Sequence, residues 1–178
     1  MGNLRNRNRT HGFTLLELLV VIAIIGVLST IVLAALNDSR NKAAASGMAQ
    51  QLQQISTGLR VYLLSEGVDQ WFDSSFNNRT INQIRNDPST NVEDYLPELP
   101  LAPNGEPYIY RINGTYSCGV AHSGISIRVS DLHLDNPDIY DALERAIDNN
   151  DGSDCGRVRH RGTSESLYFL IARDIDDI

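Results

Sequence analysis

The sequence predicts an α+β fold in which one long N-terminal helix packs against a small antiparallel β-sheet. An almost entirely apolar run at residues 13–36 is followed by apolar residues that recur with helical period up to residue 66, and short β-rich runs separated by turn signals follow from residue 107. Strands that follow a long helix, rather than alternating with helices, are typical of an antiparallel sheet. A chain of 178 residues is long enough for one small domain with accessory segments.

The chain opens with a basic leader, residues 1–12, and continues with an almost entirely apolar segment, residues 13–36. A helix needs roughly 20 apolar residues to cross the hydrocarbon core, whereas the apolar core of a secretory signal runs to only about 7 to 15. The three arginines of the leader favour a cytoplasmic N-terminus and an exported C-terminal region. A plain membrane anchor and a cleaved signal peptide both stay open at this point.

Neither alternative explains Glu17. An ionisable side chain within a membrane span is costly and indicates a function, usually with a partner. Gly12 and Phe13 stand about one helical turn before it. Cleavage between Gly12 and Phe13 would create a positive α-amino group that could neutralise a carboxylate within the bilayer. Pairing within one chain is geometrically awkward at a helix start, whereas pairing with the terminus of a neighbouring chain would drive assembly.

The stretch GFTLLELLVVIAIIGVLSTIV resembles the N-terminus of type IV pilins and of type II secretion pseudopilins. The resemblance implies that a prepilin peptidase cuts after Gly12, that Phe13 becomes N-methylated, and that Glu17 contacts the terminal amine of the adjacent subunit. It also implies a pilin-like fold, storage of the apolar half-helix in membrane lipid, and assembly into a helical homo-oligomeric filament. An inner-membrane platform with a separate ATPase motor would drive that assembly. Many pilins carry a helix-bending proline in this segment, and this chain has none.

Residues 37–66 continue the helix with one apolar stripe and a polar opposite face. The stripe recurs at steps of three or four residues and comprises Met48, Leu52, Ile55, Leu59, Tyr62 and Leu63. A single helix over residues 13–66 would be about 80 Å long. Residues 67–106 are rich in Asn, Asp, Ser and Pro and predict a connecting loop region, with a short helix around Asn82 as a further option.

Residues 107–178 predict the sheet. Two β-rich runs joined by Asn113 and Gly114 indicate a hairpin, and a third strand follows at GISIRVS. A short helix is expected near residues 137–149, where apolar residues recur every four positions and a proline stands at the start. Two further strands, in GRVRH and SLYFLIARD, would close the sheet.

The two cysteines, Cys118 and Cys155, are free to pair if this region is exported. A disulfide between them would close a loop of about 37 residues and contribute roughly 4 kcal/mol in the chain-entropy model. The resemblance favours this pairing, because a C-terminal disulfide often ties down a surface loop in pilins. Two free buried thiols are the alternative, especially in a host that does not oxidise exported proteins.

An acidic loop, DNNDGSDC at residues 148–155, gathers carboxylate and amide oxygens. Calcium takes six to eight such ligands, so Asp148, Asp151 and Asp154 are candidates. The resemblance points the same way, because some major pseudopilins bind calcium in a C-terminal loop. The spacing does not match an EF-hand, and a solvated turn is the alternative. We expect no other cofactor.

No pattern in the sequence indicates catalysis, so we do not expect an enzyme. The formal net charge of −7 argues against binding to nucleic acid. The resemblance implies a structural subunit of a type IV pilus or a type II secretion pseudopilus. It would be a single-pass membrane protein with an exported domain, found in a periplasmic or extracellular filament after assembly. The alternative is a membrane-tethered exported binding domain that does not polymerise.

Overall fold

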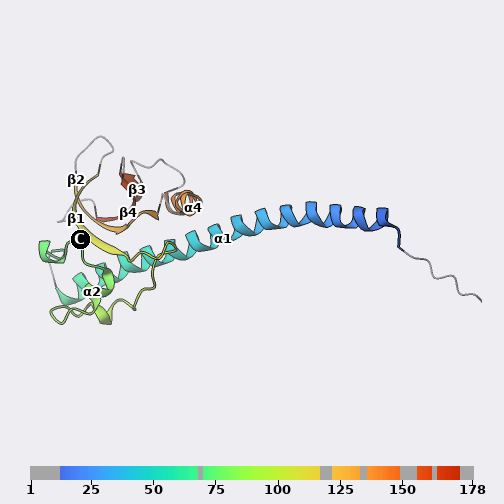
Figure 1. Ribbon diagram of the computed structural model, residues 1–178. Coiled ribbons are helices and arrows are strands. Elements are labelled where there is room, and N and C mark those ends of the chain that lie inside the picture. Colours follow the sequence, from blue (N-terminus) through green and yellow to red (C-terminus); the bar gives the residue numbers. More distant parts are fainter. Residues whose placement is uncertain are drawn as a thin grey trace, which may run out of the picture. The chain divides into compact units, whose positions relative to one another are not determined.

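We describe the fold from a computed structural model, which covers residues 13–67, 70–116, 122–132, 136–148, 156–161 and 164–172. Its α-helices are α1 (Leu15–Glu66), α2 (Ile81–Arg85) and α4 (Pro137–Asp148), with short 3-10 helices η1 (Ser74–Phe76) and η2 (Val92–Asp94). The strands are β1 (Ile109–Tyr116), β2 (His122–Val129), β3 (Val158–Arg161) and β4 (Ser164–Ala172) (Figure 1). The chain divides into an N-terminal unit, Met1–Ser39, and a C-terminal unit, Arg40–Ile178.

The long helix α1 is unbroken over 52 residues. Its length and composition suffice to cross a membrane, and none of its most apolar stretch is buried within the protein. At its C-terminal end Gly67 adopts a positive φ of 62°, the left-handed conformation in which glycine commonly ends a helix.

The C-terminal unit is a four-stranded sheet packed on the second half of α1. The strand order is β1-β2-β4-β3, and every neighbouring pair is antiparallel. All six residues of the apolar stripe on α1 are buried, and they share one core with the inward-facing residues of the sheet. The α+β class and the helix-on-sheet arrangement predicted from the sequence are therefore confirmed.

The prediction of a hairpin turn at Asn113 and Gly114 is wrong. Both residues lie inside β1, which runs on to Tyr116 and pairs with β2 from Tyr116 opposite His122 to Ile109 opposite Arg128. The register of this pair shifts between Ile112 and Gly114, so the Asn-Gly step marks a bulge in one strand rather than a turn between two. The two runs read as separate strands are consequently one strand.

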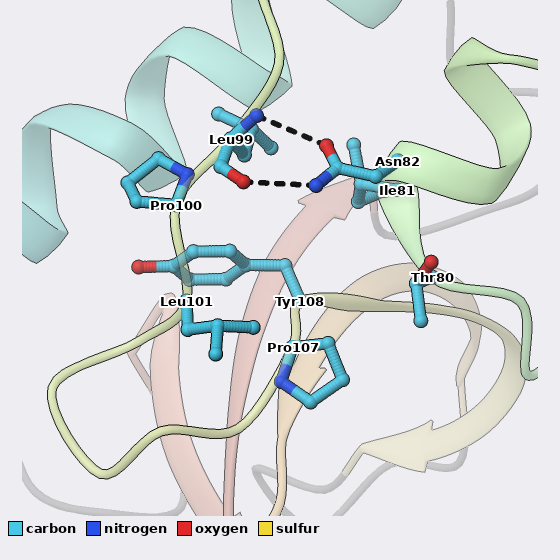
Figure 2. A pocket seen from close by; sticks show the side chains of 8 residues that line it. All are labelled: Thr80, Ile81, Asn82, Leu99, Pro100, Leu101, Pro107 and Tyr108. Carbon is cyan, nitrogen blue, oxygen red and sulfur yellow. Dashed lines mark hydrogen bonds between the residues drawn. The ribbon is translucent and has the colours of Figure 1, made fainter.

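The connecting segment folds onto α1 and the edge of β1. The helix expected around Asn82 is present as α2, which starts in a capping box formed by Thr80 and Gln83. The side-chain amide of Asn82 holds the backbone of Leu99 from both sides, donating to its carbonyl at 2.8 Å and accepting from its N–H at 3.0 Å (Figure 2). The proline-rich stretch is thereby fixed to α2.

The turn after α2 contains Asp87, whose carboxylate accepts three hydrogen bonds. Asp87 accepts bonds from the hydroxyl of Ser89 at 2.5 Å, the N–H of Ser89 at 2.9 Å and the guanidinium of Arg79 at 2.5 Å. These bonds, those from Ser89 first, lower the pKa of Asp87 to about 2. The turn is therefore built around an ionised aspartate.

Candidate functional site

The start of α1 is a capping box, formed by Thr14 and Glu17. The hydroxyl oxygen of Thr14 accepts from the N–H of Glu17 at 3.2 Å. In return, Oε2 of Glu17 accepts from the N–H of Thr14 at 2.8 Å and from its hydroxyl at 3.0 Å. Two N–H groups that have no partner within the helix are thereby satisfied.

Sequence reasoning did not find this local role for Glu17, although the Thr-x-x-Glu signature is present in the sequence. The carboxylate is therefore not an unpaired charge in the isolated chain, because it caps the helix through Thr14. A carboxylate offers about four acceptor positions. Capping by Thr14 therefore leaves Glu17 able to accept from a cation on another chain.

Phe13 lies directly before this capping box, and its side chain is 85% exposed. Its predicted neighbour across the cleavage site, Gly12, lies outside the described residues. Large apolar side chains on all sides of the following helix are also exposed in the isolated chain, from Leu15 to Leu36. A helix that is apolar all round requires an apolar environment, which lipid or other such helices provide. The isolated chain leaves this apolar stretch uncovered.

Most of the other predicted site residues cannot be compared with the structure. Cys118, Cys155, Asp151 and Asp154 lie outside the described residues, so the disulfide and the calcium site stay predictions. Asp148 is the last residue of α4, and its carboxylate accepts from the N–H of Val158 at 2.6 Å. This bond ties the end of α4 to the start of β3, which is a structural role for Asp148.

A small cleft lies between α2, the proline-rich stretch and the start of β1 (Figure 2). Its wall includes Tyr108, whose hydroxyl bonds to the side chain of Gln51 on α1 and whose pKa is raised by burial. The remaining lining is largely apolar or proline. Within the described parts of the chain, no three His, Cys, Asp or Glu residues come together to hold a metal ion. The cleft offers packing surface and no catalytic group.

Comparison with known proteins finds two kinds of similarity: a family model that matches the N-terminal segment, and curated relatives that match over a longer part of the chain. Residues 7–33 match the family model of the prokaryotic N-terminal methylation motif. The chain is 30% identical over 114 residues to the type II secretion system core protein G of Pseudomonas aeruginosa, covering 61% of this chain and 78% of that protein. It is also 30% identical over 110 residues to the protein of the same name from Escherichia coli K12, covering 60% and 74%. No solved structure matches the chain significantly.

Proposed function

Because the chain belongs to the family of type II secretion system core protein G, we propose that it is a structural subunit of a type II secretion pseudopilus. The observation that carries the proposal is the start of α1. Glu17, whose carboxylate caps the helix, stands at the start of an exposed apolar half-helix, four positions after the residue that processing would make the N-terminus. Between a pilus and a secretion pseudopilus, the relatives favour the pseudopilus.

The first step of the proposal is processing at the membrane. The chain inserts as a single-pass inner-membrane protein, with residues 1–12 in the cytoplasm and the C-terminal unit exported. A prepilin peptidase cleaves between Gly12 and Phe13 and methylates the new terminus at Phe13. The match to the methylation motif over residues 7–33 supports this step.

The second step is transfer of the apolar half-helix from lipid to a filament core. The same side chains would be covered by lipid before assembly and by equivalent helices of other copies after it. Lipid tails are as apolar as these side chains, so association in the membrane gains little from the hydrophobic effect. Extraction therefore requires work, which an assembly platform with its own ATPase motor would supply. We propose no catalytic activity for this chain.

Glu17 would exchange or share partners in the second step. In the isolated chain its carboxylate caps the helix through Thr14. In the filament it would also receive the positive terminal amine of Phe13 from the adjacent copy. A buried charge pair of this kind stabilises little but can specify alignment. Glu17 would consequently determine which neighbouring copy is bound and the axial register between the two copies.

Two substitutions at Glu17 separate the capping role from the charge role. Glu17→Ala removes both, whereas Glu17→Gln keeps a capping box, because glutamine also serves at this position, and removes only the charge. We expect both variants to insert and to lose their leader, and both to be absent from filaments sheared from cells with the secretion machinery. Intact mass measures leader removal, and immunoblotting measures the sheared fraction.

The outcome for Glu17→Gln decides between the interpretations. Normal filaments from this variant would show that capping alone explains the residue and would overturn the charge contact. A wild-type chain that keeps Met1 and never enters the sheared fraction would instead support the membrane-tethered, non-polymerising alternative.

A further inference from the structure

Charges are sparse along α1, and their positions repeat one spacing. In the processed chain they are the amine at Phe13 and the side chains of Glu17, Asp38, Arg40, Lys42, Arg60 and Glu66. Four positions separate Phe13 from Glu17, and four separate Asp38 from Lys42. The order of the signs is opposite: positive before negative in the first pair, and negative before positive in the second.

A regular α-helix extended back from Leu15 to Phe13 would place both pairs on the same side. Each residue of the second pair follows its counterpart in the first by 25 positions, and seven helical turns take about 25 residues. The helix α1 is continuous from Leu15 to Glu66. Asp38 and Lys42 are exposed in the isolated chain. In such a helix, one face would therefore carry a charge pair at each end of the apolar segment.

A four-residue offset between parallel copies would match opposite charges at both ends. When Phe13 of one copy is level with Glu17 of the next, Asp38 of the first is level with Lys42 of the second. Four residues correspond to about 6 Å along the axis. No like charges of α1 become level at this offset, whereas an offset of two residues would set Arg40 beside Lys42.

We propose that Asp38 of one copy pairs with Lys42 of the adjacent copy, as a second contact that fixes the register of the filament. The inference rests on the proposed function, because it takes the offset from the Phe13–Glu17 contact. The partner for this helix face is a second copy of the chain. Neither Asp38 nor Lys42 is without a partner in the isolated chain, so assembly exchanges partners here as it does at Glu17.

A second contact of this kind would specify a register that the apolar segment alone specifies poorly. Side chains of similar size and character recur along residues 13–36, so a slip by one turn would keep most apolar contacts. Polar groups at single positions of helix interfaces specify register for this reason. An exposed ion pair contributes little affinity by itself, but this one would recur at each subunit, and like charges in its place would oppose the register.

Charge reversal with co-expression tests the pairing between copies. D38K and K42D, each expressed alone, would bring like charges level along the whole filament. We expect each to be inserted and processed, and each to fall at least tenfold below wild type in the sheared filament fraction. Expressed together, the two chains offer opposite charges to one another at every contact. We expect mixed filaments at no less than about half the wild-type yield.

Two controls make the result specific. R40D keeps both Asp38 and Lys42 and should assemble alone, whereas D38K co-expressed with it should stay depleted from the filaments, because lysine would face lysine at one of its two contacts. The doubly exchanged chain D38K/K42D keeps the net charge beside the membrane and should assemble alone. Intact mass confirms leader removal in each variant, which separates faulty insertion from faulty assembly.

Normal filaments from D38K or K42D alone would overturn the inference. So would failure of the mixture to exceed the single variants, because the charges would then act only within one chain. The wild-type chain and Glu17→Gln, measured alongside, keep the two proposals distinct. If the wild type, D38K and K42D all form filaments and Glu17→Gln does not, the proposed function stands and only the second contact is refuted.

Discussion

Among the glycines that the structure describes, Gly58 on α1 is the one where an added β-carbon would meet the closest contacts. A β-carbon built on Gly58 would lie 2.4 Å from Cδ2 and 2.8 Å from Cγ of Leu96, and 2.9 Å from the carbonyl oxygen of Tyr95. Leu96 is itself buried in the core, and the carbonyl belongs to the backbone. Gly58→Ala therefore requires the segment around η2 to move away from α1.

The expected cost follows from two opposing effects. Overpacking a well-filled core by a methyl group costs about 1–3 kcal/mol, and the contact with a backbone atom places Gly58→Ala toward the upper end. Alanine recovers about 1 kcal/mol over glycine through its helix propensity. We therefore expect a net loss of about 1–2 kcal/mol. At about 4 °C for each kcal/mol in a domain of this size, Tm should fall by roughly 4–8 °C.

Gly47, on the same helix, is the matched control, because a β-carbon there would meet nothing within 4 Å. Gly47→Ala should raise stability by about 0.5–1 kcal/mol through helix propensity and the unfolded state. Thermal unfolding of residues 40–178, followed by circular dichroism, measures both variants in one series. Equal shifts in Tm for the two variants, in either direction, would refute the close packing of η2 on α1.

Four further predictions use the same assay or a simple labelling step. The low pKa of Asp87, about 2, stabilises the fold above its unfolded pKa near 4. Wild type should therefore lose stability from pH 4 to 2, and Asp87→Asn should lose less over that window. Asn82→Ala breaks both bonds to Leu99 and should lower the free energy of unfolding by about 1–3 kcal/mol, with faster proteolysis of the proline-rich stretch. An unchanged Tm would contradict a stabilising role for these two bonds. Thiol labelling of the unreduced exported domain should leave Cys118 and Cys155 unmodified, and labelling of both would refute the disulfide. If the acidic loop binds calcium, calcium should raise Tm, and no rise would dismiss the site.

Local patterns predicted the parts of the fold whose causes are local. The apolar stripe on α1 recurs every three or four residues, so its burial could be read from periodicity alone. The helix near residues 137–149 carries a proline where a helix can start, and α4 begins at Pro137. The sequence predicts the helix around Asn82 only as an option, and the Thr-x-x-Gln signature at Thr80 that would have strengthened that prediction is also local.

The failures have causes that the local patterns do not contain. The Asn113-Gly114 step is a strong turn signal, but pairing of the flanking residues with β2 extends β1 through it and absorbs the glycine in a bulge. The two hydrogen bonds between Asn82 and Leu99 join positions 17 residues apart, and no periodicity connects these positions. The capping box at Glu17 is a different case, since its Thr-x-x-Glu signature is local and lies within a segment whose apolar composition indicates a membrane span.

The mass of the subunit recovered from sheared filaments tests the central claim most directly. Filaments would be collected from cells that express the wild-type chain with the secretion machinery, and the subunit would be analysed by intact mass and by N-terminal fragmentation. We predict a chain that begins at Phe13 and carries one methyl group on its α-amino nitrogen. A filament subunit that retains Met1, or one cleaved near Ala35, would contradict the account.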